Sequence, residues 1–171
     1  MLCRQKESGV ERVALTPHFY PLREELQDFL KKRQHAFAEI MACWDGKTMP
    51  QLRLGAEVHY SPCLADLNLR SLALDGSDYL LLELSDMTVP AHIEQVLKIM
   101  LEQRITPVLA HVERCVYFAE DPTKLVRLVE LGALAQISAG ALTGKRKKFA
   151  GICLQKNAAQ IIASDIHGTG T

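Results

Sequence analysis

The chain has 171 residues, of which 48% are hydrophobic, and this is enough apolar sequence for one domain with a substantial core. Its 20 basic residues balance 20 acidic residues, so the net charge of zero disfavours a general nucleic-acid partner or an anionic membrane. The longest apolar runs are far shorter than the roughly 20 residues that span a bilayer, and the first residues lack a signal-peptide core. We therefore expect a single cytoplasmic domain over residues 1–171, with no nucleic-acid partner and no membrane insertion.

The five cysteines are scattered and form no Cys-x-x-Cys pair, which is typical of reduced thiols rather than of a disulfide framework. A cysteine-dependent tyrosine phosphatase would need a nucleophilic cysteine and an arginine closing one glycine-rich loop. Cys63 and Arg70 are the nearest such pair, and the residues between them include no glycine. The sequence therefore disfavours a cysteine nucleophile.

Along the chain, short β-rich runs alternate with longer helical patterns. Strands are predicted at residues 12–15, 51–58, 79–84, 107–110, 133–138 and 161–164, and helices at residues 22–42, 91–103, 122–131 and 145–157. The helix at 122–131 has a good start, because Asp121 can cap it and Pro122 suits its first turn. The alternation predicts an α/β fold with a largely parallel sheet, open or closed into a barrel.

Histidines and carboxylates stand at the ends of five predicted strands. They lie in the motifs Thr16-Pro17-His18, Gly55-Ala56-Glu57, Leu82-Glu83-Leu84, Ala110-His111-Val112-Glu113-Arg114 and Ser164-Asp165-Ile166-His167. In a parallel β/α fold, active sites are built at the carboxyl ends of the strands. Taken singly, such a histidine is more often structural, Glu83 could face solvent, and Asp165 could cap a helix. Five positions in register favour one common site.

The residue types at these strand ends indicate metal chemistry. Imidazole nitrogen together with carboxylate oxygen suits Zn, Mn or Fe, whereas an all-oxygen set would indicate Mg or Ca. Glu57 could bridge two metal ions about 3.5–4 Å apart, the spacing used in two-metal phosphoester hydrolysis. Arg114, three residues beyond His111, could bind phosphate with its planar guanidinium. His59, two residues beyond Glu57, could point into the same site.

In this order, the motifs resemble those of PHP phosphoesterases. The Leu-Leu-Glu-Leu strand and the Ala-His-x-Glu-Arg form resemble the branch of manganese-dependent protein-tyrosine phosphatases from bacterial capsule and exopolysaccharide loci. The similarity covers nearly the whole chain. It implies a distorted (β/α)7 PHP-type barrel with a trinuclear metal centre, usually manganese, with iron or zinc as alternatives.

The resemblance also implies roles for individual residues. Arg114 would bind the phosphate. The implied metal ligands fall into three groups: Glu57 as the bridging carboxylate with Glu83 and His111, Asp165 on a second ion, and His18 with His167 on a third. The implied activity is hydrolysis of phosphotyrosine by a metal-activated hydroxide, often on a cognate bacterial tyrosine kinase that controls polysaccharide export. Two alternatives stay open: a PHP phosphatase for a small phosphomonoester, and an inactive truncated regulatory or binding remnant.

The sequence departs from the family pattern at both ends. The family opens with a strand carrying Asp-x-His-x-His, whereas residues 1–10 here match the end of the helix that follows that strand. The chain stops at residues 168–171, where the family continues with more helix. We therefore expect a barrel without its first strand and C-terminal end, with weak metal retention and low activity for this chain alone. Exposed strand edges would favour an oligomer.

Overall fold

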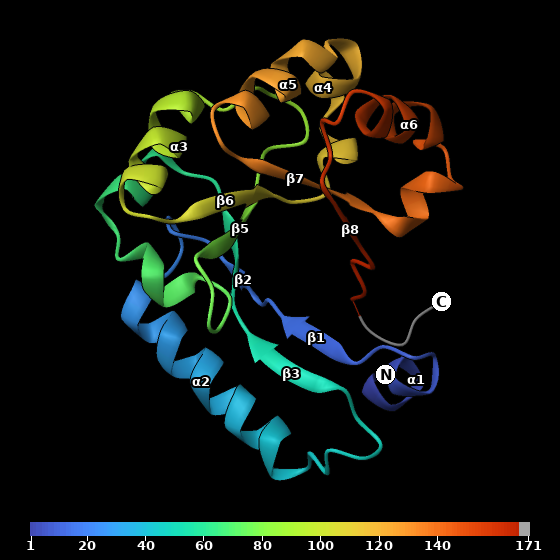
Figure 1. Cartoon of the computed structure of the whole chain (residues 1–171). Coiled ribbons are helices and arrows are strands. Elements are labelled where there is room, and N and C mark those ends of the chain that lie inside the picture. The colour runs from blue at the N-terminus through green and yellow to red at the C-terminus, as the bar shows by residue number, and fades with distance from the viewer. Residues whose placement is uncertain (168–171) are drawn as a thin grey trace.

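Residues 1–167 of the computed structural model form two parallel β-sheets with helices packed around them (Figure 1). Residues 168–171, beyond which we expected the family pattern to continue with more helix, lie outside the described part of the chain. The smaller sheet pairs β1 (Arg12–Leu15) with β3 (Gln51–Leu54). The larger sheet has the order β2-β4-β5-β6-β7-β8. Its strands are β2 (His18–Phe19), β4 (Glu57–His59), β5 (Tyr79–Glu83), β6 (Thr106–Leu109), β7 (Leu134–Ser138) and β8 (Ile161–Ala163).

The predicted alternation of strands and helices in a parallel α/β fold is confirmed, but the predicted strand at residues 51–58 is wrong. Gly55 and Ala56 interrupt it, so that β3 and β4 belong to different sheets. The bend at Gly55 is closely packed, because a Cβ atom there would lie 2.8 Å from Leu74 Cδ2. The amides of Gly55 and Glu57 donate to Leu15 O at 2.9 Å and to Pro17 O at 3.0 Å, so backbone pairing continues across the break.

The four predicted helices are confirmed, with differences at their ends: α2 (Leu26–Ala42), α3 (Ile93–Glu102), α5 (Pro122–Glu130) and α6 (Lys147–Gln155). Two shorter helices join them: α1 (Leu2–Glu7), where the resemblance implied the end of a helix, and α4 (Val116–Glu120), which was not predicted. Short 3-10 turns follow several strands: η1 (Pro62–Asp66), η2 (Leu69–Leu72), η3 (Val112–Arg114) and η4 (Ala139–Leu142). The helix predicted from residue 22 begins at Leu26, because the amides of Arg23 and Glu24 close a turn onto Tyr20 O.

The core lies where the larger sheet meets its helices. Leu80 and Leu82 of β5 are fully buried, and α3 buries Ile93, Leu97 and Met100 at helical spacing. Figure 1 shows α2 alongside the smaller sheet, where Arg33 donates to Gly55 O at 3.1 Å. None of the helices within residues 1–167 has both the length and the apolar character needed to cross a membrane.

Candidate metal centre

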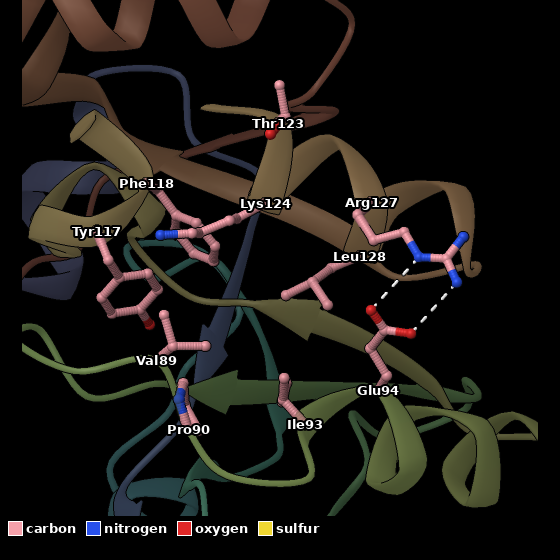
Figure 2. A pocket seen from close by; sticks show the side chains of 10 residues that line it. All are labelled: Val89, Pro90, Ile93, Glu94, Tyr117, Phe118, Thr123, Lys124, Arg127 and Leu128. Carbon is pink, nitrogen blue, oxygen red and sulfur yellow. Dashed lines mark hydrogen bonds and ion pairs between the residues drawn. The ribbon is translucent and has the colours of Figure 1, made fainter. Parts of the chain in front are cut away.

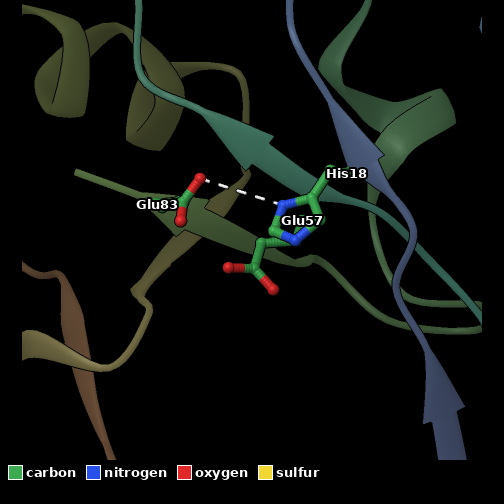
Figure 3. Close-up of side chains that lie close together, drawn as sticks. All are labelled: His18, Glu57 and Glu83. Carbon is green, nitrogen blue, oxygen red and sulfur yellow. Dashed lines mark ion pairs between the residues drawn. The ribbon is translucent and has the colours of Figure 1, made fainter. Parts of the chain in front are cut away.

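Three of the predicted ligands converge where β2, β4 and β5 are neighbours in the sheet (Figure 3). One potential ligand atom from each of His18, Glu57 and Glu83 lies within 4.8 Å of the other two. The strand register explains this convergence, since His18 is the partner of Glu57 across β2 and β4. His18 Nδ1 and Glu83 Oε2 are 3.8 Å apart.

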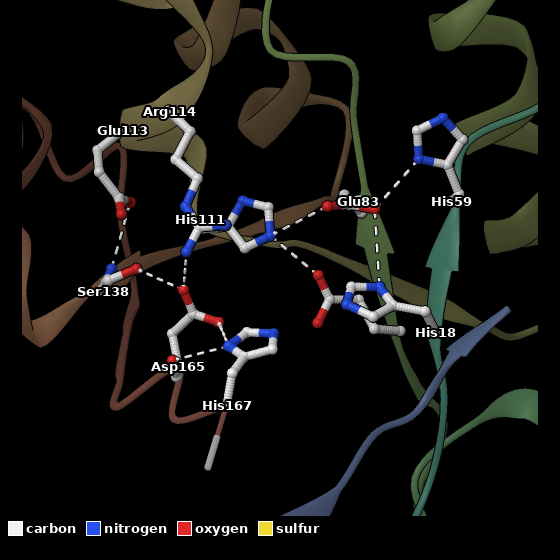
Figure 4. Close-up of polar contacts among 10 residues, drawn as sticks. His18, His59, Glu83, His111, Glu113, Arg114, Ser138, Asp165 and His167 are labelled. Atoms are coloured by element: carbon white, nitrogen blue, oxygen red, sulfur yellow. Dashed lines mark hydrogen bonds and ion pairs between the residues drawn. The ribbon is translucent and has the colours of Figure 1, made fainter. Parts of the chain in front are cut away.

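His111 reaches the two carboxylates of this group from the turn after β6 (Figure 4). Its Nε2 lies 2.9 Å from Glu57 Oε1 and 3.6 Å from Glu83 Oε1. Burial alone would raise the pKa of Glu57, but the hydrogen bond and charge of His111 and the charges of His18 and His167 together outweigh it, so the pKa is below its ordinary value. Burial alone would lower the pKa of His111, but the hydrogen bond that its imidazole donates to Glu57 helps to raise it above its ordinary value. We call His18, Glu57, Glu83 and His111 the inner cluster.

The remaining predicted site residues surround Asp165 (Figure 4). Arg114 Nη2 donates a hydrogen bond to Asp165 Oδ2, and Ser138 Oγ lies 3.4 Å from the same oxygen. His167 Nδ1 lies 3.5 Å from Asp165 Oδ1. We call Arg114, Asp165 and His167 the outer cluster. The His167 ring stacks on His18 with 5.9 Å between ring centroids, so the two clusters meet.

Two site residues have left-handed backbone conformations. The φ angle is 31° at His111 and 52° at Asp165. A side chain that carries a Cβ adopts this region at an energetic cost, although Asp and His tolerate it better than most. His111 lies in the turn that follows β6, and Asp165 lies two residues beyond the end of β8, so both side chains project from the carboxyl ends of strands.

The structure adds residues that the sequence left undecided or unassigned. His59 Nδ1 lies 3.1 Å from Glu83 Oε2, so this histidine does point toward the inner cluster. Glu113 is buried, and its Oε2 accepts a hydrogen bond from Ser138 N at 3.2 Å. Glu113 stands inside the predicted motif and could have been suspected. Ser138 ends a strand and carries no distinctive sequence signal.

The chemistry of the inner cluster fits a divalent transition metal. His18 Nδ1 and His111 Nδ1 are buried and have no hydrogen-bond partner within residues 1–167. His18 Nδ1 and His111 Nε2 face the carboxylates of Glu57 and Glu83, and this mixed nitrogen and oxygen set suits Mn, Fe or Zn better than Ca or Mg. A cation would also offset the charges of Glu57 and Glu83 in a partly dry site.

An apolar pocket of about 290 Å³ lies apart from both clusters, between α3 and α5 (Figure 2). An ion pair between Arg127 and Glu94, with a nitrogen–oxygen distance of 3.3 Å, lies at its wall. Its apolar lining comes from Val89, Pro90, Ile93, Phe118 and Leu128. None of the predicted site residues lines this pocket, so it is separate from the candidate metal centre.

Comparison with known proteins identifies relatives of the chain. The family model "Capsular polysaccharide synthesis, CpsB/CapC" matches residues 1–171. The chain is 34% identical over 123 residues to tyrosine-protein phosphatase YwqE of Bacillus subtilis, which covers 68% of this chain and 48% of that protein. It is 30% identical over 124 residues to tyrosine-protein phosphatase CpsB of Streptococcus pneumoniae, and this match covers 66% of this chain and 51% of that protein. The chain thus spans about half the length of these curated relatives.

The same relationship is visible in three dimensions. The fold is similar to a chain from the crystal structures of YwqE from Bacillus subtilis and CpsB from Streptococcus pneumoniae, which are metal-dependent tyrosine phosphatases. The TM-score is 0.82 at 23% identity, over 97% of this chain and 70% of that chain. This match confirms the predicted PHP-type α/β fold. By its sequence and by its fold, this chain belongs to the CpsB/CapC family of capsular polysaccharide synthesis proteins.

Proposed function

We propose that this protein is a metal-dependent protein-tyrosine phosphatase that acts in the synthesis of capsular or extracellular polysaccharide. The observation that carries the proposal is the meeting of the inner cluster, rich in metal-binding groups, with an arginine of the outer cluster. The names of the relatives YwqE and CpsB support the same activity.

In this proposal the two clusters together would hold divalent metal ions. Glu57, Glu83 and His111 would hold one ion, Asp165 would hold a second, and His18 with His167 would hold a third. When bound, divalent ions supply positive charge that acidifies water and offsets the charge on phosphate oxygens. The short contact between His111 Nε2 and Glu57 Oε1 orients both groups before any ion binds.

Arg114 binds the phosphate of the substrate. Its contact with Asp165 uses Nη2, and a guanidinium has five N–H donors, so other donors remain for phosphate oxygens. Asp165 in turn lies 3.4 Å from the hydroxyl of Ser138. This chain of contacts fixes the guanidinium at the border between the two clusters, where a bound phosphate would touch both.

We further propose manganese as the physiological ion and phosphotyrosine of a bacterial tyrosine kinase as the substrate. The mixed nitrogen and oxygen donor set supports manganese, with iron or zinc as competitors. A cytoplasmic location agrees with the free thiols of all five cysteines.

The test is Mn²⁺-dependent release of phosphate from a phosphotyrosine peptide. We expect EDTA to abolish the activity. We expect His111→Ala to lower it by more than about 100-fold, because even residues that only support metal ligands contribute about 10–100-fold. The matched control is His35→Ala, since the His35 side chain is 79% exposed on α2 and should leave activity unchanged.

Other outcomes would replace the proposal. Faster turnover of a small phosphomonoester than of the peptide would favour a small-molecule phosphatase. Binding of the phosphopeptide without any turnover at saturating Mn²⁺ would favour a regulatory binding protein.

A further inference from the structure

The segment after the first ligand places an aromatic ring next to the inner cluster. In β2, Phe19 points into the core, where it is 1% exposed and lies 4.9 Å from the Phe29 ring. Because side chains alternate along a strand, His18 and Tyr20 share the opposite face. The Tyr20 ring lies 5.7 Å from the His18 ring with 22° between their planes, and 5.5 Å from the His59 ring.

A tight turn then brings a cation onto this ring. Arg23 N donates to Tyr20 O at 2.9 Å, which closes the turn, and Pro21 stands at the position where proline presets the backbone. The guanidinium carbon of Arg23 lies 4.8 Å above the centre of the Tyr20 ring, a cation–π contact. Leu22 is 82% exposed at the tip. The turn is therefore a preorganised surface of aromatic, cationic and apolar groups.

The charge of Arg23 is available to a ligand. Within residues 1–167 it forms no ion pair, whereas its neighbour Glu24 is engaged by Lys32 at 3.2 Å. The only contact that orients its guanidinium in this part of the chain is the face of Tyr20. A guanidinium that lies flat on one ring can accept a second aromatic ring on its other side.

We propose that Tyr20 and Arg23 bind the aromatic ring of the substrate, so that the site selects aryl phosphates over alkyl phosphates. This inference rests on the phosphatase function proposed above and names residues that set its substrate class. The substrate ring packs against the Tyr20–Arg23 pair while Arg114 binds the phosphate. An alkyl phosphate gains no aromatic or cation–π contact from this pair.

The test measures binding rather than turnover. Two fluorescent peptides of identical sequence carry either phosphonomethylphenylalanine or an aliphatic phosphonate, and neither can be hydrolysed. Each is titrated with the full chain in Mn²⁺. We expect the wild type to prefer the aryl probe. Tyr20→Leu should weaken binding of the aryl probe about tenfold, which corresponds to about 1.4 kcal/mol, and leave binding of the alkyl probe unchanged.

Matched variants separate recognition from support of the fold. Tyr20→Phe keeps the ring and should keep the preference for the aryl probe, whereas Arg23→Gln should reduce it. Tyr79→Leu is the control, because Tyr79 is 45% exposed at the start of β5, the end away from Glu83, and should change neither affinity.

Two results would overturn the assignment. Equal weakening of both probes by Tyr20→Leu would show that Tyr20 only supports His18. Unchanged binding of both probes by Tyr20→Leu would show that the aromatic ring of the probe does not bind at this turn. Wild-type protein that binds neither probe would instead refute phosphoryl binding at the site, and the phosphatase function together with this proposal.

Discussion

The buried contact between His111 and Glu57 predicts a large loss of stability for the metal-free chain in the variant His111→Ala. The two side chains are 2% and 6% exposed, and Nε2 lies 2.9 Å from Oε1. Removing one member of a buried ion pair costs about 3–5 kcal/mol, because the other charge is left without its partner. A domain unfolds with a free energy of about 5–15 kcal/mol, so we expect the variant to fold with much of its stability lost.

The size of this penalty should depend on pH. The folded pKa of Glu57 is below 4.5, so its ionic contribution is present above about pH 4.5 and is lost as the pH falls through the folded pKa. The folded pKa of His111 is above 6.5, so its contribution is fully present below pH 6.5 and is lost as the pH rises through the folded pKa. The penalty of His111→Ala should therefore be largest between pH 4.5 and 6.5.

Urea unfolding in EDTA, followed by the fluorescence of the single tryptophan, measures this penalty inside and above the pH window. His35→Ala is the control, because the His35 side chain is 79% exposed. A penalty below about 1 kcal/mol, the value of an exposed ion pair, would refute the reasoning. A penalty that is the same at every pH would refute it as well.

Four further predictions concern the fold. Leu82→Ala, in the fully buried part of β5, should lower the free energy of unfolding by about 2–5 kcal/mol in urea titrations, whereas substitution of an exposed leucine should change it little. Burial raises the pKa of Cys115 and of Cys153 to about 11, so both thiols should resist iodoacetamide in the native state while exposed Cys3 reacts, as read by mass spectrometry. For the same reason, stability should fall as the pH rises from 9.0 toward about 11. Asp121→Ala removes the side chain that caps α5 and should cost about 1 kcal/mol in thermal unfolding. Equal labelling of the buried and exposed thiols would contradict the prediction about Cys115 and Cys153. An unchanged melting temperature for Asp121→Ala would contradict the prediction about the helix cap.

Local patterns were sufficient for the four longer helices and for a largely parallel sheet. They did not predict α4 or the two-residue strand β2, because elements this short carry little periodic signal. The break at Gly55 could not be predicted, because it depends on close packing against Leu74, which is distant in sequence. A turn at residues 20–24 makes α2 begin at Leu26 rather than at residue 22, and Pro21 is a sequence signal for that turn. Apolar spacing alone wrongly extends the helix through the turn.

The convergence of the predicted site residues follows from topology, since parallel strands deliver their carboxyl ends to one edge. Which residues touch there depends on side-chain conformations that sequence spacing does not encode. His18, for example, is close both to Glu83 and to the ring of His167, although the resemblance grouped it with His167 alone. The ligand roles themselves stay predictions until an ion is bound and its ligands are identified.

The left-handed backbone at His111 and Asp165 bears on any attempt to engineer this protein. At both positions glycine would relieve a conformational cost of about 1–3 kcal/mol and at the same time delete a side chain of the site. At His111, however, the loss of the buried contact with Glu57 costs about 3–5 kcal/mol and exceeds this relief, so selection for heat resistance alone should keep the histidine. The side chain that strains the backbone here also stabilises the carboxylate beside it, so neither property can be changed without the other.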